Sequence, residues 1–149
     1  MLRIEEDIAV YRALDILERR TREPGSYVTE PRDMQKLVEL HLKSLEHEAF
    51  LVFTLDARHS LISATTLFTG SATGAAVYVG RLVRHVLLEN ACAVIIAHNH
   101  PSGVADPSAA DLTLTDRVRD ALQLVEIRLL DHIIIGKGRF YSFAERGRL

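Results

Sequence analysis

Two histidines, a serine and an aspartate stand close together in residues 97–111, AHNHPSGVADPSAAD. His98 and His100 are two residues apart at the end of a strongly apolar run. In an extended chain, residues i and i+2 point to the same side, so both imidazoles can face one point. Neutral imidazole is a good ligand for Zn²⁺. The pair is therefore either ordinary loop chemistry or two ligands of one metal ion.

Ser108 and Asp111 also have two interpretations. Ser-x-x-Asp is typical of a helix N-terminus, where the serine caps the first turn and the aspartate favours the positive end of the helix dipole. A carboxylate in that first turn is also free to reach back toward the two histidines. Two His and one Asp leave a fourth coordination position open, as in catalytic zinc sites. Such a site acidifies a bound water to a pKa of about 7 and needs a general base, usually a glutamate.

The apolar pattern predicts the elements that must position these residues. Spacings of three and four predict a helix near the N-terminus and a second helix beginning near Pro31. Residues 49–56 and 60–68 predict a hairpin, and the continuous apolar run 92–98 predicts a strand buried on both faces. Helices are expected at 79–91 and 108–125, and a last strand pair at 127–136 and 139–144. The order ααββαβαββ favours an α/β or α+β layer fold on a single sheet.

The length and the cysteine content limit the domain organisation and the compartment. The chain has 149 residues, which favours one compact domain. Pro24 and Gly25 interrupt the pattern, so we expect an N-terminal amphipathic helical arm over 1–24 and the main domain over 25–149. The single cysteine, Cys92, excludes an internal disulfide, and we expect it in the core. No signal-peptide pattern and no apolar run of ~20 residues are present, which indicates a cytoplasmic protein without a membrane span.

The charge distribution disfavours nucleic acid as a partner. The formal net charge is -2, and the arginines are scattered without forming a basic tail. Nonspecific nucleic-acid binding needs a dense cationic face, because phosphate contacts supply most of its affinity.

A further histidine, His41, lies on the apolar stripe of the second predicted helix, and we interpret it as a packed residue rather than a ligand.

The spacing H-x-H, seven residues, Ser, two residues, Asp resembles the JAMM motif of the MPN/JAB-type metallopeptidases. His98, His100, Ser108 and Asp111 match every fixed position. With HNHPSG, LLDHIIIG and YSFAERG in the same order, the chain is most similar to the bacterial RadC branch, from about residue 28 to residue 149. The resemblance implies a mixed β-sheet flanked by helices, with a layout like that of cytidine deaminases.

The resemblance also implies a zinc site and a general base. Glutamate is expected just before the first strand, where RadC-type sequences show E-x-F, and Glu48 precedes Ala49 and Phe50 here. Glu48 is therefore the expected general base, and Glu46 is the reserve candidate. The implied Zn²⁺ ligands are His98, His100 and Asp111.

Three further residues receive expected roles from the same resemblance. Ser108 is expected to hydrogen-bond the oxyanion that develops during the reaction. Asp131 and His132, at the start of the last strand pair, are expected to support the site from behind the ligands rather than bind the metal.

The predicted function is that of a zinc metallopeptidase of JAMM type, acting on a peptide or isopeptide bond in a peptide or protein substrate. The alternatives are a non-catalytic interaction scaffold and a DNA-repair-associated RadC-like protein. RadC proteins usually have an upstream helix–hairpin–helix region, whereas the first ~25 residues here predict a single helix, so the DNA-repair alternative gains no support. A homodimer is compatible with this prediction. No long insertion of the kind that grips ubiquitin is present, so the sequence names no substrate.

Overall fold

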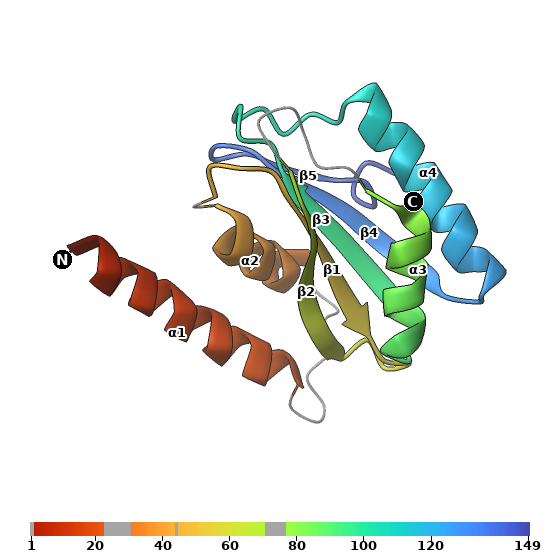
Figure 1. The fold of residues 1–149 in the computed structure, drawn as a ribbon, viewed down its shortest axis with the longest axis horizontal. Helices are drawn as coiled ribbons and strands as arrows, with labels where there is room; N and C mark the ends of the chain where they lie inside the picture. The colour runs from red at the N-terminus through yellow and green to blue at the C-terminus, as the bar shows by residue number, and fades with distance from the viewer. Residues whose placement is uncertain (1, 23–30, 44, 71–76) are drawn as a thin grey trace.

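The computed structural model describes residues 2–22, 31–43, 45–70 and 77–149. Figure 1 shows the elements in order: α1 (Leu2–Arg22), α2 (Pro31–Leu42), β1 (Ala49–Leu55), β2 (Leu61–Thr69), α3 (Val79–Leu88), β3 (Ala93–Asn99), α4 (Ala109–Leu124), β4 (Arg128–Ile135) and β5 (Phe140–Ser142). This is the predicted order. The predicted linker at Pro24 and Gly25 lies outside the described residues.

The strands form one mixed sheet in the order β2-β1-β3-β4-β5. β3 and β4 are parallel and are joined through α4, while the other neighbouring pairs are antiparallel. Every residue of β3 is buried, as its continuous apolar run predicts for a strand covered on both faces. The prediction of an α+β fold on a single sheet flanked by helices is confirmed.

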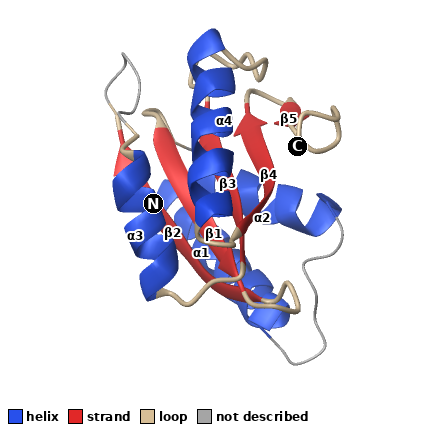
Figure 2. Cartoon of the chain, turned by 90° about the vertical axis from the view of Figure 1, so that its right-hand side faces the viewer, coloured by secondary structure: helices blue, strands red, loops and turns tan. Residues whose placement is uncertain are grey.

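Helices cover both faces of this sheet, and each face has its own apolar core (Figure 2). α2 packs on one face, with Leu14 and Leu17 of α1 lying against the same core. α3 and α4 pack on the other face through Leu82, Val118 and Leu122. Because side chains alternate along a strand, β3 sends Ala97 and Asn99 toward α2 and His98 toward α4. The fold thereby places His98 on the α4 face.

His41 is a packing residue between the two N-terminal helices. Its side chain is half-buried, and Nε2 lies 3.1 Å from Glu18 Oε1 of α1. The ring meets Phe53 of β1 edge-on, with the ring centroids 6.0 Å apart. Burial lowers the pKa of His41, although the nearby Glu18 carboxylate opposes that shift. These contacts give His41 a role in holding α1 to α2.

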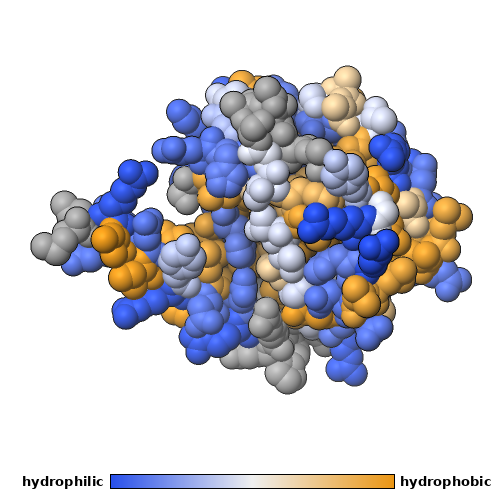
Figure 3. Space-filling view, in the orientation of Figure 1, coloured by the Kyte–Doolittle hydropathy of each residue, from blue (hydrophilic) through white to orange (hydrophobic). Residues whose placement is uncertain are grey.

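The N-terminal half of α1 leaves an apolar face uncovered. Ile4, Ile8 and Tyr11 are 64%, 47% and 72% exposed, whereas the later residues of the same stripe pack on the core. Figure 3 shows apolar side chains on this projecting part of α1, among charged ones. Among the described residues, no helix is both long and apolar enough to cross a bilayer.

The prediction that Cys92 is a core residue is wrong, because its side chain is exposed. Cys92 lies just before β3, and its backbone bonds to both neighbouring strands: its N–H donates to Leu55 O, and its carbonyl accepts from Arg128 N. The flanking Ala91 and Ala93 take the inward positions. The apolar run thus begins one residue later than the sequence suggests.

Candidate metal centre

The end of β3 and the start of α4 bring three predicted ligands together. His98 is buried on β3, His100 is half-buried just beyond the strand, and Asp111 lies in the first turn of α4. The two histidine Nε2 atoms are 3.0 Å apart. Asp111 Oδ1 is 3.2 Å from His98 Nε2, and Asp111 Oδ2 is 3.1 Å from His100 Nε2. All three side chains therefore point to one place.

The helix-capping and reach-back interpretations of Ser108 and Asp111 are both realised. Ser108 Oγ accepts a hydrogen bond from Asp111 N at 3.1 Å, and Ser108 N donates to Asp111 Oδ2 at 2.9 Å, which completes a capping box. The same Oδ2 atom faces His100. Ser108 is exposed, and no described residue accepts its hydroxyl proton. That proton is free to be donated to a bound molecule.

Glu48 reaches the site through strand pairing. β1 runs antiparallel to β3 with Phe50 opposite His98, so the same register sets Glu48 across from His100. One ligand atom each from Glu48, His98 and His100 lie within 4.8 Å of one another. Glu46, the reserve candidate, is instead exposed and lies 4.0 Å from Arg3 at the surface. The structure brings Glu48, and not Glu46, to the two histidines.

Asn99, between the two histidines, holds the chain on either side of Glu48. Its side-chain Oδ1 accepts from Ala49 N at 2.8 Å, and its Nδ2 donates to His47 O at 2.9 Å. Asn99 is buried, so both bonds are shielded from water. The residue that separates the histidine ligands in the sequence therefore also fixes the backbone of the candidate base.

Hydrogen bonds behind His98 determine which of its ring nitrogens has a proton. The Thr115 hydroxyl donates to Asp111 O at 2.7 Å, so its oxygen must accept from His132 Nδ1–H at 2.6 Å. His132 Nε2 is then an acceptor, and it receives His98 Nδ1–H at 2.9 Å. Burial and the neighbouring His98 lower the pKa of His132 well below its ordinary value, which keeps this ring neutral. His98 Nε2 is left with a lone pair facing the site.

His100 has the same tautomer for a simpler reason. Its Nδ1 lies 2.8 Å from the carbonyl oxygen of Val104, which can only accept, so Nδ1 holds the proton. Two ring lone pairs and a carboxylate thus converge, an arrangement that favours a cation or a shared proton between them. The hydrogen bond to Asp111 raises the pKa of His100, so a proton can serve that purpose. Burial raises the pKa of Asp111, but the adjacent His100 and His98 rings and the hydrogen bond from Ser108 N outweigh it and hold that pKa well below its usual range.

This donor set fits zinc. Two neutral imidazoles with Nε2 lone pairs and one ionised carboxylate are ligands that Zn²⁺ accepts, and each imidazole donates its other N–H to a fixed acceptor. Cysteine takes no part, since Cys92 is exposed at the opposite end of β3.

Asp131 and His132, the two residues expected to support the ligands, make different contacts. His132 touches His98 directly. Asp131 accepts hydrogen bonds from His132 N, Ser142 Oγ and Ala144 N, so its carboxylate fastens the segment around β5 to β4. Within the described residues, Asp131 makes no hydrogen bond to a candidate ligand.

Thr115 was not identified from the sequence. It lies in the buried stripe of α4 formed by Asp111, Thr115, Val118 and Leu122. A hydroxyl on the buried face of a helix needs a hydrogen-bond partner. The position of Thr115 in an otherwise apolar stripe was the feature of the sequence that could have identified it. The identity of the partner, His132, depends on how α4 crosses the sheet.

Replacing Thr115 by Val is expected to weaken zinc binding about 10–100-fold, the usual effect of losing a partner that orients a ligand. The change leaves His132 Nδ1–H without an acceptor and releases the tautomer of His98. A competition titration with a zinc chelator measures the affinity. Thr113→Val is the matched control, since Thr113 is on the same helix, is exposed, and among the described residues its hydroxyl bonds only to Ala109 O. Equal zinc affinity in the two variants would contradict the orienting role.

The turn after β4 supports the loop that follows His100. His100 N donates to Ile135 O at 2.8 Å, and Lys137 N donates to Gly103 O at 2.9 Å. Gly136 lies so close to this loop that an added Cβ would be 2.3 Å from Gly103 O. Only glycine allows this approach, because the contact is with backbone atoms that have no flexible end to move aside.

Gly136→Ala is therefore expected to destabilise the fold by at least about 1–3 kcal/mol, the usual cost of overpacking. Urea unfolding measures the change in the free energy of unfolding. Gly80→Ala provides the comparison, because Gly80 lies in α3 and a Cβ added there would have nothing within 4 Å. In that helix, alanine is expected to stabilise by about 0.5–1 kcal/mol. Equal stabilities of the two variants would show that the loop after His100 moves to accommodate the added methyl group.

Comparisons with known proteins agree with the fold and the motif. The family model of the RadC-like JAB domain matches residues 28–148. The chain is 46% identical over 140 residues to the UPF0758 protein YkfG of Escherichia coli K12, covering 94% of this chain and 89% of that protein. It is 47% identical over 141 residues to a UPF0758 protein of Marinobacter nauticus, covering 93% of this chain and 63% of that protein. A Vibrio cholerae relative is 48% identical over 127 residues, covering 85% of this chain and 57% of that protein.

The chain thus spans less than two thirds of two of these relatives, and their names specify no activity. The domain match nevertheless extends over most of this chain, including every residue of the candidate centre. The chain belongs to the RadC-like JAB domain family.

Proposed function

We propose that this protein is a zinc-dependent hydrolase, a JAMM-type metallopeptidase that cleaves an amide bond in a peptide or protein. The observation that supports this most is the convergence of Glu48 with two histidines whose lone pairs point to one place. A purely structural metal site has no need of an additional half-buried carboxylate beside its ligands.

His98, His100 and Asp111 would hold the ion in this proposal. Zinc, when bound there, supplies Lewis acidity, which makes water a nucleophile near neutral pH and polarises a carbonyl group. Asn99 fixes the backbone around Glu48, and Thr115 and His132 fix the ring of His98, so the protein groups are in place before substrate arrives.

Glu48 moves the proton in the proposed reaction. Its carboxylate takes a proton from the water whose oxygen attacks the carbonyl carbon, and it delivers that proton to the nitrogen as the C–N bond breaks. The products are a carboxylic acid and an amine, so the atoms of one water are added across the bond. Ser108 donates its unused hydroxyl proton to the oxygen that gains charge in the transition state.

A second candidate is a non-catalytic scaffold. The exposed apolar face of α1, formed by Ile4, Ile8 and Tyr11, favours it, because such a face suits a protein partner. The DNA-repair alternative is supported only by the name of the family. A net charge of -2 provides no electrostatic basis for binding DNA.

The test is cleavage of a defined peptide mixture by the zinc-loaded protein, with mass spectrometry to detect new termini. The hydrolase predicts new carboxyl and amino termini with wild type and none with Glu48→Gln. Two results together would favour the scaffold. The zinc-loaded wild type would cut no peptide or folded-protein substrate, and binding of a partner protein would require α1.

A further inference from the structure

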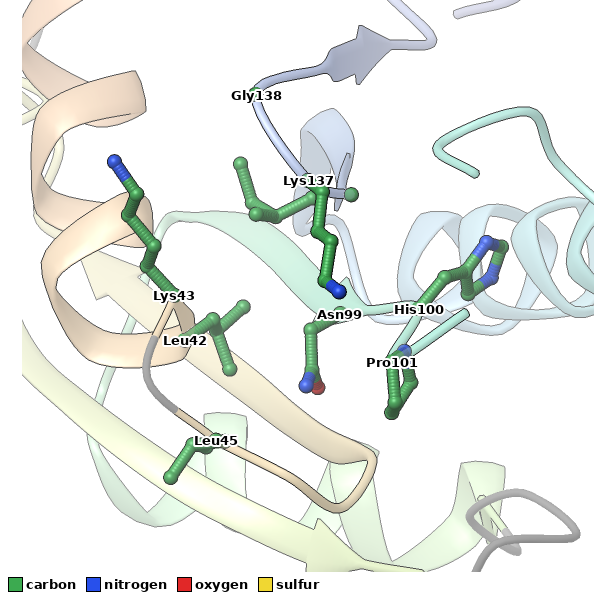
Figure 4. A pocket seen from close by; sticks show the side chains of 10 residues that line it. Leu42, Lys43, Leu45, Asn99, His100, Pro101, Lys137 and Gly138 are labelled. Carbon is green, nitrogen blue, oxygen red and sulfur yellow. The ribbon is translucent and has the colours of Figure 1, made fainter. Parts of the chain in front are cut away.

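A cavity of ≈ 240 Å³ adjoins the metal centre. It lies between the C-terminal end of α2, the end of β3 and the turn after β4. His100 and Pro101 form one wall, and Figure 4 shows the His100 ring turned away from the cavity. The cavity therefore shares the β3-terminal segment with the metal centre.

Two lysines line this cavity. The chain has three lysines among 18 basic residues, and two of the three, Lys43 and Lys137, line the cavity. No acidic residue lines it, and neither lysine forms an ion pair within the described part of the chain. We call this cavity, lined by Lys43, Lys137, Asn99 and His100, the lysine pocket.

Lys137 is held in place by close packing. Three carbons of its side chain, Cβ, Cγ and Cδ, would lie only 3.3 Å from a Cβ added to Gly103, so its stem runs along this glycine. Figure 4 shows the ammonium group reaching toward Asn99 and the end of β3, while Lys43 extends from α2 on the other side of the cavity. The Asn99 amide accepts from Ala49 N through Oδ1 and donates one Nδ2 proton to His47 O, so the lysine ammonium groups are the charged donors among these residues.

We propose that the lysine pocket binds a carboxylate of the peptide substrate, close to the bond that is cleaved. This inference rests on the proposed hydrolase function and specifies its substrate class. The carboxylate is either an acidic side chain or the free carboxyl terminus of the peptide, because both present the same two acceptor oxygens to the ammonium groups.

The size of the pocket agrees with one residue of a longer chain. Its volume is below the ~300–1,000 Å³ typical of pockets that enclose a whole small molecule. An extended peptide advances about 3.3–3.6 Å per residue, so a chain crossing the end of β3 moves from the metal centre to the lysine pocket within a few residues. A polynucleotide would instead need a long cationic track, and two lysines do not provide one.

Binding without turnover tests the proposal. Reductive methylation with ¹³C-formaldehyde keeps the lysine charge and labels Lys36, Lys43, Lys137 and the N-terminal amine, and Lys→Met variants assign the three lysine signals. The zinc-loaded Glu48→Gln protein is titrated with Ac-Ala-Ala-Glu-Ala-Ala-NH₂, with its Gln counterpart, and with Ac-Ala-Ala-Ala-Ala-Ala bearing a free carboxyl terminus. The Glu peptide and the free-terminus peptide separate the two carboxylate sources.

The expected result is a shift of the Lys43 and Lys137 signals, and not of Lys36, with at least one carboxylate peptide and not with the Gln peptide. Lys137→Met keeps the stem on Gly103 and should weaken binding about two- to fivefold, the range for a partly exposed ion pair. Lys36→Met is the matched control and should leave affinity unchanged. Affinity should fall with added salt.

Failure of both carboxylate peptides to bind more tightly than the Gln peptide, or equal shifts of all three lysines, would overturn the proposal. Binding of oligothymidylate at the same two lysines, with no carboxylate peptide bound, would overturn it in favour of a phosphate ligand. Because the readout needs no cleavage, selective shifts combined with an inactive wild type would refute the hydrolase and leave the carboxylate site standing.

Discussion

Glu48→Gln is expected to lower the rate of amide hydrolysis about 10²–10⁴-fold, the usual contribution of a positioned general base, while zinc stays bound. Glutamine has the same shape as glutamate, so the hydrogen bonds from Asn99 to the flanking backbone persist. Its amide cannot take a proton from water at neutral pH. Steady-state cleavage of the best peptide from the mixture, together with metal analysis of the same sample, measures both quantities.

Glu46→Gln is the control for this experiment. Glu46 is two residues away, is exposed and lies near Arg3, outside the cluster of ligand atoms. Its replacement should change the rate less than twofold, since exposed ion pairs contribute little. A Glu46→Gln defect as large as that of Glu48→Gln would contradict the assignment of the base, and so would full activity in Glu48→Gln.

His98→Ala is expected to abolish both zinc binding and hydrolysis. The change removes one of the three proposed ligands and also leaves His132 Nε2 without its donor inside the protein. The loss of zinc affinity should exceed the about 10–100-fold loss expected for Thr115→Val, which removes only an orienting partner. Isothermal titration of the metal-free protein with zinc measures the difference.

Two comparisons separate loss of the ligand from loss of the fold. His100→Ala removes a half-buried side chain, and it should lose zinc while its metal-free form unfolds as the metal-free wild type does. His47→Ala removes an exposed histidine beside the site, and it should bind zinc normally. Normal zinc affinity in His98→Ala would mean that the histidine pair is not the metal site.

The sequence predicted those parts of the site that depend on local spacing. The order of helices and strands follows from apolar periodicity, and the i, i+2 relation of His98 and His100 follows from strand geometry. The capping box of Ser108 and Asp111 is equally local. These features need only a few neighbouring residues to be recognised.

Other parts depend on how distant segments pair. Glu48 was proposed from the family resemblance, and its place opposite His100 results from the β1–β3 register, which the local pattern does not specify. The chain of contacts from Thr115 through His132 to His98 needs α4, β4 and β3 in their final positions. The prediction for Cys92 is wrong for a smaller reason: the strand begins one residue later than the sequence suggests. Cys92 therefore precedes the part of β3 that is covered on both faces, and its side chain is exposed.

The zinc content of the purified wild-type protein, measured beside His100→Ala, tests directly whether these side chains form a zinc site. About one zinc per wild-type chain is expected after incubation with zinc and removal of the excess, and almost none in His100→Ala. Less than about half an equivalent in the wild type, with no gain on adding zinc, would contradict it.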